Sequence, residues 1–378
     1  AQARGGPAPP LIAPIYPTFW RWMAVHKGAS LLLLPWLLAV PNSALRAGAS
    51  GGGSAKRGRL AVVVSGLQER LLWRSKVERV VAPTVRAGHS VDVYLEVVAS
   101  GASGRRFATA DPKGQVRSPE ADVENLGSAL AQSITNAGGR LAHFRVRQEL
   151  EELSLPAGEA AERLPKHLFQ YSPLTDPLGK NVLRRYQTTE RLANLSAASG
   201  EEYDFVLWTR DDDHWLGPLD LGRFLADSKA PWRMYSKACL RFNGINDKTL
   251  LFGREAAKAM LGRLYTDFWL PEKSLEVQNA ERFVEAFALV KGVESVPVPF
   301  GQLPTADSVF VRAAPGAEAR LCQKDRYLCA LGPPGLPSGQ GFERPSPCGT
   351  QGSGESAAEV QNETSDRGRG KNETERAA

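Results

Sequence analysis

The sequence predicts an α/β domain with a mostly parallel central sheet flanked by helices. Short apolar runs rich in β-branched residues alternate with longer stretches of helical periodicity across residues 60–300. Glycines close several of these stretches, as at Gly66 and Gly138. Hydrophobic residues make up 42% of the 378 positions, which is enough for a sizeable core. Strands that alternate with helices in this way are typical of a parallel sheet.

The first half of the domain is predicted to run strand, helix, strand, helix, strand. We expect these elements at residues 59–66, 68–86, 90–98, 118–138 and 141–148. The second helix carries both of its end signals. Ser118 is a preferred N-cap residue, Pro119 suits the first turn, and Gly138 is a stop.

The second half continues the alternation. A long helix is predicted to lead into the apolar strand 203–208, and shorter elements follow it. We expect helices at 179–198, 219–227, 254–267 and 273–291, and strands at 203–208, 232–242, 248–253 and 294–300. In open sheets of this kind, ligands bind beyond the carboxyl ends of the strands.

Composition divides the chain into five parts. An N-terminal tail precedes an apolar stretch, a Gly/Ser-rich flexible linker follows it, and a C-terminal tail rich in Gly, Pro, Ser and Glu is expected to be disordered. The globular domain lies between the linker and that tail. The predicted boundaries are 1–27, 28–45, 46–59, 60–330 and 331–378.

The apolar stretch 28–45 is close to the shortest length that crosses a bilayer. Tryptophans and positive charge beside it suit a membrane interface. Besides a transit peptide or a buried helix, two interpretations stay open: an uncleaved signal-anchor of a type II membrane protein, or a cleaved signal peptide. Both predict a domain in the lumen of the Golgi or endoplasmic reticulum, with the membrane as a partner in the first case.

Cysteines and glycosylation sequons agree with a lumenal location. No CxxC pair occurs, so a structural zinc site is not expected. A disulfide that involves Cys322, Cys329 or Cys348 is predicted; its connectivity stays open, because a fourth cysteine, Cys239, lies far upstream. Sequons begin at three asparagines and suggest a glycoprotein: Asn194, Asn362 and Asn372.

The charge pattern argues against nucleic acid as a partner. The formal net charge is +6, and the cations are scattered along the chain. No basic helix with interleaved aromatic residues is present in the sequence, although such a helix would be expected of a nucleic-acid binder. A cleft for anionic phosphates needs only a few of these cations.

Three consecutive aspartates follow the apolar strand 203–208. Asp211, Asp212 and Asp213 repel one another unless a cation is present. A hard divalent ion such as Mg²⁺ or Mn²⁺ removes the repulsion, because it prefers oxygen ligands and shares them with phosphates. The alternative is a solvated acidic turn capped by its own side chains.

A hydrophobic strand that ends in a DxD or DDD cluster resembles the metal-binding motif of GT-A-fold glycosyltransferases. Other stretches agree in order and spacing over residues 60–300. The opening strand ends in Ser65-Gly66-Leu67-Gln68-Glu69-Arg70, which is one residue longer than the SGQxR of related families. "GINDKTLLFGREAAKAML" and "NAERFVEAFALVKG" resemble a later strand–helix segment and a late acceptor-facing helix.

The resemblance implies a single GT-A-like, Rossmann-like domain that binds a nucleotide-diphosphate sugar. It implies a metal at the aspartate triplet and donor contacts from Ser65, Gly66 and Arg70. Asp92, on the second strand, is a further candidate for ribose or base. Arg210 is predicted either to contact phosphate or to pair with one of the aspartates.

An inverting reaction also needs a carboxylate that deprotonates the acceptor hydroxyl. Glu281 is the first candidate base and Asp247 the second, although each also fits a helix-surface or cap role. A retaining reaction needs no such base. His214 is a candidate to complete the metal shell, with solvation beside the acids as the alternative.

The predicted function is metal-dependent transfer of a sugar from a nucleotide-diphosphate donor to a hydroxyl of a glycan, protein or lipid in the secretory pathway. Two alternatives stay open. One is a non-catalytic lumenal nucleotide-sugar or glycan-binding protein of the same fold. The other is a metal-dependent phosphohydrolase, although "DDDHW" lacks the threonine of a DxDxT pattern.

Overall fold

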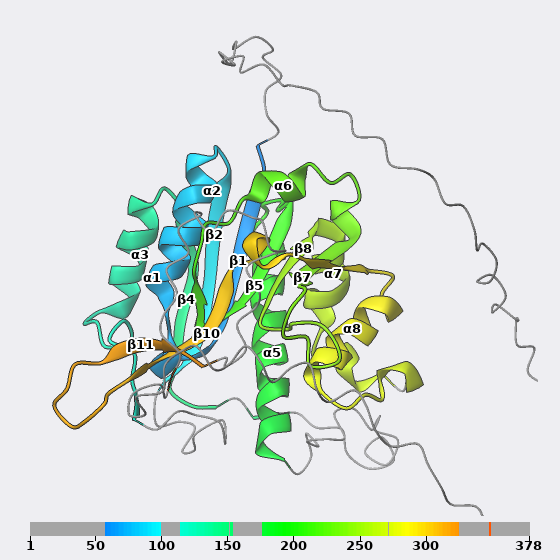
Figure 1. Ribbon diagram of the computed structural model, residues 1–378. Helices are drawn as coiled ribbons and strands as arrows, with labels where there is room; N and C mark the ends of the chain where they lie inside the picture. Colours follow the sequence, from blue (N-terminus) through cyan, green and yellow to red (C-terminus); the bar gives the residue numbers. More distant parts are fainter. Residues whose placement is uncertain are drawn as a thin grey trace, which may run out of the picture. The chain divides into compact units, whose positions relative to one another are not determined.

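The structure is a computed structural model, and its central feature is a seven-stranded sheet (Figure 1). The strand order is β4-β2-β1-β5-β8-β7-β9. The pairs β4–β2, β2–β1, β1–β5 and β7–β9 are parallel, whereas β8 runs antiparallel to β5 and β7. The predicted α/β class with a mostly parallel sheet is therefore confirmed. In sheet order the strands span Arg140–Arg147, Ser90–Val98, Arg59–Leu67, Phe205–Arg210, Thr249–Gly253, Arg233–Lys237 and Glu294–Val298.

The structure describes residues 57–99, 114–150, 152–153, 176–270, 272–324 and 348. All of them belong to one compact unit, residues 55–378. The predicted tails, the apolar segment 28–45 and most of the linker lie outside the described residues, apart from Cys348. Within the described ranges, no helix has the length and apolar character needed to span a bilayer.

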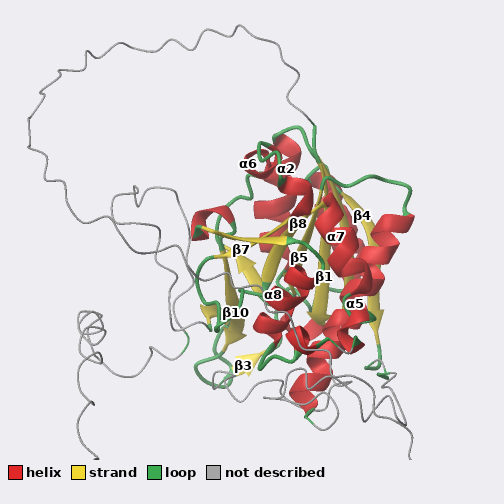
Figure 2. Cartoon of the chain, turned by 90° about the vertical axis from the view of Figure 1, so that its right-hand side faces the viewer, coloured by secondary structure: helices red, strands yellow, loops and turns green. Residues whose placement is uncertain are grey.

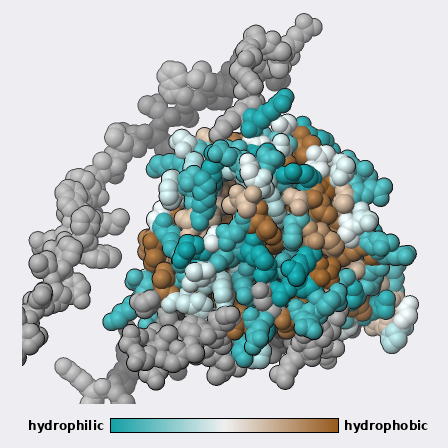
Figure 3. All heavy atoms as spheres, turned by 180° about the vertical axis from the view of Figure 1, so that it is seen from behind, coloured by the Kyte–Doolittle hydropathy of each residue, from teal (hydrophilic) through white to brown (hydrophobic). Residues whose placement is uncertain are grey.

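Helices cover both faces of the sheet (Figures 1 and 2). On one face lie α1 (Trp73–Lys76), α2 (Ala82–Arg86), α3 (Leu126–Asn136) and α6 (Leu221–Leu225). On the other lie α5 (Pro177–Ala198), α7 (Arg254–Met260) and α8 (Ala280–Val290). On the side of the molecule in Figure 3, hydrophilic residues cover most of the described surface, and hydrophobic ones form smaller separate areas.

Strand β1 shows why the central strands appear in the sequence as unbroken apolar runs. Leu60, Val62 and Val64 belong to the core under α1–α3, whereas Ala61 and Val63 belong to the core under α5, α7 and α8. Successive side chains of a strand point to opposite faces, and here both faces are buried. Every position is therefore apolar, and the polar residues are left to the strand ends.

A second, smaller sheet lies beside the aspartate turn. β10 (Thr305–Val311) lies between β11 (Arg320–Gln323) and β3 (Gln115–Val116), and it pairs antiparallel with both. β10 also pairs antiparallel with β6 (Asp213–Trp215), the short strand that follows the aspartates. The sequence did not predict these four strands.

Some predicted helix boundaries are wrong. Helix α3 begins at Leu126 rather than at Ser118. The Ser118 hydroxyl accepts a hydrogen bond from the Glu120 amide (3.2 Å) and donates one to the Leu71 carbonyl (2.9 Å). Ser118 therefore caps a short turn before α3 and ties this turn to Leu71. Residues 68–86 form a 3-10 turn and then a helix that contains a π turn, Val77–Val81.

A disulfide joins Cys322, on β11, to Cys348. Cys322 is buried against Val309 and Val311 of β10. The predicted disulfide among the C-terminal cysteines is therefore present, and it fixes Cys348 beside the small sheet.

Candidate metal and donor site

The aspartate triplet lies where β5 ends and β6 begins. Arg210 is the last residue of β5, Asp211 and Asp212 form the turn, and Asp213 is the first residue of β6. All three aspartates are buried, with exposures of 1% or less. The alternative of a solvated surface turn is therefore excluded.

Asp211 is tied to the end of β1. Its carboxylate accepts hydrogen bonds from the Leu67 amide (2.9 Å) and from Arg70 Nε (3.0 Å). This approach requires glycine at the preceding position, because a Cβ on Gly66 would lie 2.1 Å from Asp211 Oδ1. Gly66 also has φ +156°, a region that side chains disfavour. The structure thus gives Gly66 a steric role in holding Asp211, and its predicted contact with the donor stays a prediction.

Asp212 and Asp213 each have one carboxylate oxygen held in place. Asp212 Oδ2 accepts from Arg210 Nη2 (2.9 Å) and lies 3.2 Å from Arg70 Nη1. Asp213 Oδ2 accepts from the Thr249 hydroxyl (2.6 Å) and from the Arg210 amide (3.1 Å). Neighbours from β5, from β8 and from the turn after β1 therefore orient the side chains of Asp212 and Asp213.

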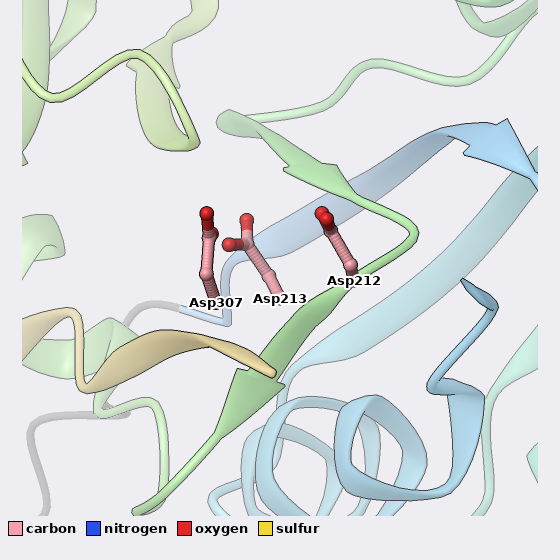
Figure 4. A group of neighbouring side chains, drawn as sticks. All are labelled: Asp212, Asp213 and Asp307. Carbon is pink, nitrogen blue, oxygen red and sulfur yellow. The ribbon is translucent and has the colours of Figure 1, made fainter. Parts of the chain in front are cut away.

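Asp307 joins these two residues from β10. It lies directly opposite Asp213 in the antiparallel β6–β10 ladder, and its Oδ2 pairs with Lys248 Nζ at 2.5 Å. In all three aspartates the second oxygen, Oδ1, is buried and has no hydrogen-bond partner among the described residues. Carboxylate oxygens of Asp212, Asp213 and Asp307 lie within 4.8 Å of one another, and Figure 4 shows the side chains directed to the same side.

This arrangement fits a hard divalent cation. Unsatisfied buried carboxylate oxygens are costly, and three of them converge here. Mg²⁺ and Mn²⁺ prefer oxygen ligands and retain positions for phosphate or water. Asp212, Asp213 and Asp307 are thus the residues that could hold the ion. Asp211, predicted with the triplet, instead pairs with Arg70.

The charge states follow from the same contacts. Burial, followed by the neighbouring charges of Asp307 and Asp212, raises the pKa of Asp213. Burial acts in the same direction on Asp307, but Lys248 and Arg210 outweigh it and lower the pKa of that carboxyl. The cluster therefore combines like-charge repulsion with cations on its rim, which is the situation that a bound divalent ion would relieve.

A cavity of about 480 Å³ opens beside the cluster. It is lined by the carboxyl ends of β1, β2 and β5, by α5 and by the start of α8. The charged residues of its wall are Arg70, Arg184, Arg185, Arg210, Lys324, Asp211, Asp247, Glu281 and Asp307. The cations suit a diphosphate, and the position agrees with the expected ligand site of such a sheet.

Glu281 faces this cavity from the first turn of α8. Asn279 caps the helix by accepting a hydrogen bond from the Arg282 amide (2.9 Å), which places Glu281 in the first turn. Burial and then the nearby Asp247 raise the pKa of Glu281 to about 7. A carboxylate with this pKa can accept a proton near neutral pH.

Asp247, the second candidate base, is part of a buried ion pair. Its Oδ2 accepts a hydrogen bond from Arg185 Nη2, on α5. The Arg185 guanidinium also lies 5.3 Å from the ring centre of Trp208. Asp247 is therefore engaged with a cation, whereas Glu281 carries the raised pKa.

The structure brings most of the predicted site residues together. Ser65, Gly66, Arg70 and Arg210 all line the cavity. The Ser65 hydroxyl lies 3.2 Å from that of Thr189, on α5. For Arg210 the structure shows the predicted salt bridge to an aspartate and also a position on the cavity wall.

Asp92 is the exception, because it lies near the amino end of β2. Val98, at the other end of this strand, lines the cavity, and six residues of strand span about 20 Å. The Asp92 carboxylate accepts hydrogen bonds from Arg140 Nε (2.7 Å), Tyr203 Oη (2.7 Å) and Arg59 Nη2 (3.0 Å). The structure thus places Asp92 in a structural ion pair instead of at the predicted nucleoside contact.

His214 does not join the acidic cluster. It follows Asp213 in β6, and adjacent side chains of a strand point to opposite faces. Burial, followed by the charges of Lys76 and Arg79, lowers its pKa to about 4. His214 therefore faces the α1 side rather than the carboxylates.

Asp307 and Lys248 are the residues that sequence reasoning missed as site residues. Asp307 lies inside a strand, "TADSVFV", and no local motif marks it. An aspartate inside a β-branched, partly apolar run was the available signal, since aspartate is disfavoured in strands. Lys248 lies next to the predicted Asp247, but only the fold shows that it pairs with Asp307.

No protein-family model and no curated protein matches the sequence. Two solved structures of the glycosyltransferase GlyE from Streptococcus pneumoniae TIGR4 are similar, one of them described as the apo form. They are 11% and 12% identical, with TM-scores of 0.33 and 0.31, and the matches cover 65% and 64% of this chain. The chain spans 46% and 45% of those proteins, so less than half of their length. A likeness of this size carries no argument about activity, which must rest on the site itself.

Proposed function

We propose that the protein transfers a sugar from a nucleotide-diphosphate donor to a hydroxyl acceptor in a reaction that depends on a divalent metal. The observation that carries this proposal is the buried triad of Asp212, Asp213 and Asp307, with one oxygen of each carboxylate unpartnered among the described residues. Asp307 of the triad lines a cavity at the carboxyl ends of the strands, and the described wall of this cavity carries five cations and four carboxylates. A diphosphate that shares a metal with carboxylates fits this combination.

The donor side of the cavity is formed by Asp307 of the triad and by two arginines. A divalent ion, when bound, would neutralise the diphosphate and stabilise it as a leaving group. Arg70 and Arg210 both line the cavity, and both form an ion pair with Asp212 Oδ2. These guanidinium groups can donate further hydrogen bonds to phosphate oxygens, because each carries five N–H donors.

The acceptor side is formed by Glu281 at the start of α8. Its raised pKa, about 7, suits a group that takes the proton of an acceptor hydroxyl as the bond to the sugar forms. Asp247, held by Arg185, positions a negative charge near Glu281 and contributes to that raised pKa. A base in this position is what an inverting transfer requires, so we propose inversion at the anomeric carbon.

We also propose that the domain works in the lumen of the Golgi or endoplasmic reticulum and that residues 28–45 anchor it. The Cys322–Cys348 disulfide supports an oxidising compartment. The sequon residue Asn194 is exposed on α5, where a glycan can be accommodated. Loss of mass on endoglycosidase treatment, together with protease protection in intact microsomes, tests this location.

The function is tested by thermal-shift screening of UDP- and GDP-sugars with and without Mn²⁺. We expect stabilisation by one class of donor only when metal is present, and no stabilisation of Asp213→Asn or Asp307→Asn. Asp220→Asn is the matched control, because Asp220 is exposed and pairs only locally with Arg223 of α6. Turnover of the stabilising donor is then followed with hydroxyl acceptors, and NMR of the product's anomeric proton reports the stereochemistry.

The outcomes separate the proposed function from its alternatives. Metal-dependent donor binding without turnover on any acceptor would favour a non-catalytic binding protein. Release of inorganic phosphate from simple phosphate esters would favour a phosphohydrolase. An unchanged metal response in both triad variants would place the metal elsewhere and overturn the assignment of the site.

A further inference from the structure

Lys76 is a buried cation that lies directly beneath the aspartate turn. It is 4% exposed, and its Nζ donates hydrogen bonds to the main-chain carbonyls of Asp213 (2.7 Å), Leu72 (3.0 Å) and Asp211 (3.2 Å). Two of these three carbonyls belong to the acidic triplet itself. The lysine thus contacts the turn from the side of α1.

Burial lowers the pKa of Lys76, but its three carbonyl contacts and the neighbouring aspartates favour the charged form. An ammonium group has three N–H donors, whereas a neutral amine has two. Three carbonyl oxygens surround Nζ, and a carbonyl can only accept, so all three bonds form only with the protonated lysine. A positive charge therefore lies within a few ångströms of the aspartates that could hold a metal.

Lys76 differs from the other cations of the site in what it binds. Arg70, Arg210 and Lys248 each pair with a carboxylate oxygen. The Lys76 bonds all go to main-chain oxygens, so its charge acts on the cluster without occupying an oxygen that a metal could use. Its effect on a bound cation would therefore be electrostatic repulsion rather than competition for ligands.

The surrounding segment holds Lys76 firmly in this position. The Leu72 amide donates to the Asp211 carbonyl (2.9 Å), and the Trp215 amide donates to the Ser75 hydroxyl (3.2 Å). The start of this helix is thus joined to Asp211 in the aspartate turn and to β6 after the turn.

We propose that Lys76 is an internal counter-ion that offsets the repulsion of the aspartates and thereby limits the affinity of the triad for a divalent ion. The inference rests on the metal site of the proposed function. The acidic turn is then stable without metal, and the ion is exchangeable, arriving with the donor's diphosphate. Lys76 is a positioning residue, because it acts through the aspartates and does not touch the substrate.

The test is the affinity of the full chain for Mn²⁺ alone, measured from the electron paramagnetic resonance signal of free Mn²⁺. We expect Lys76→Met to bind Mn²⁺ about tenfold more tightly than the wild type, because a nearby positive charge is removed. We also expect a larger rise in melting temperature on adding Mn²⁺ than in the wild type. A purely structural role would give the opposite sign, because a loosened turn weakens metal binding.

Two variants sharpen this experiment. Lys76→Arg keeps the charge and should return the Mn²⁺ affinity to within about threefold of the wild type. Lys291→Met is the matched control, because Lys291 pairs with Asp267 at the far end of α8 and should leave Mn²⁺ affinity unchanged.

Lys237→Met keeps the inference testable if Lys76→Met does not fold. Lys237 is fully buried on β7, donates to the Thr305 carbonyl (2.7 Å) and also acts electrostatically on Asp213. Its removal should tighten Mn²⁺ binding in the same direction. Equal or weaker Mn²⁺ binding in folded Lys76→Met, or in Lys237→Met where Lys76→Met does not fold, overturns the inference. Failure of the wild type to bind Mn²⁺ better than Asp213→Asn would instead overturn the metal site and the proposed function.

Discussion

The two ends of the central sheet each contain buried aspartate, but the aspartates differ in how completely they are satisfied. At the amino end, Asp92 has both carboxylate oxygens bonded, to Arg140, Arg59 and Tyr203. At the carboxyl end, Asp213 and Asp307 each keep one oxygen without a partner in the described part of the chain. Burial of an aspartate is therefore no sign of function by itself. The unsatisfied oxygen distinguishes a binding site from a structural ion pair.

The difference also appears in the pKa values. Arg140, Tyr203 and Arg59 outweigh the effect of burial and lower the pKa of Asp92. Burial and like charges raise the pKa of Asp213. The first cluster is stable as it stands, whereas the second gains from an additional cation. Substitutions at the two ends should consequently affect different properties of the protein.

The largest effect is expected for Asp213→Asn at the carboxyl end. Loss of a metal ligand should lower turnover about 10³-fold, since the metal supplies several kcal/mol of transition-state stabilisation. Stability without metal should change little, because a repelling charge is removed. Steady-state kinetics and thermal melts of the same preparation check both points. A large fall in melting temperature with turnover retained would contradict the comparison.

Glu281→Gln should lower turnover by about 10²-fold through loss of the base. Metal-dependent donor binding should persist, because Glu281 contributes no ligand to the triad. In the wild type the rate should rise as the pH passes about 7, where Glu281 loses its proton. Initial rates between pH 5 and 9 for both proteins show whether this rise disappears in the variant. An unchanged pH profile would remove Glu281 from the proposed role.

Asp92→Asn should act on stability alone. Replacing the charged acceptor of Arg140, Arg59 and Tyr203 should lower the free energy of unfolding by about 2 kcal/mol. Because the pKa of Asp92 is lowered in the folded state, its contribution is present above about pH 4 and is lost as the pH falls through the folded value. Urea titrations at pH 7 and pH 3 measure the difference, and donor binding per folded molecule should be retained.

The raised pKa of Glu281 also has a cost in stability with the opposite pH dependence. The folded form holds its proton up to about pH 7, whereas the unfolded chain releases it near the ordinary value of 4.5. The destabilisation is absent below about pH 4.5, grows as the pH rises from 4.5 to 7, and is complete above about pH 7. Glu281→Gln should therefore gain on the order of 1 kcal/mol over the wild type between pH 5 and 8. Melts that run parallel across this range would contradict it.

The smallest effect is expected for Asp220→Asn on the surface. Its ion pair with Arg223 is exposed on both sides, so the free energy of unfolding should stay within about 0.5 kcal/mol of the wild type. Metal response and turnover should also be unchanged. This variant shows whether removal of any aspartate charge affects the site. If Asp220→Asn changes the metal response or turnover, the effects of Asp213→Asn and Asp92→Asn cannot be attributed to their positions in the sheet.

The fold class and the position of the acidic turn were readable from the sequence, because both depend on neighbours along the chain. β1 and β5 are buried on both faces, and they are apolar without interruption from Leu60 to Val64 and from Phe205 to Trp208. A change from an apolar run to three aspartates marks a strand end wherever it occurs.

Only the tertiary structure decided which carboxylates meet. Asp307 joins the triad because β10 pairs with β6 in one register, and a different register would have presented Ser308 or Ala306 to Asp213. Asp92 was predicted near the ligand because it lies on the second strand, yet its distance from that strand's carboxyl end separates it from the cavity. Residue types and their order along the chain determine the elements. Strand register and the direction of each side chain, which depend on distant partners, determine the site.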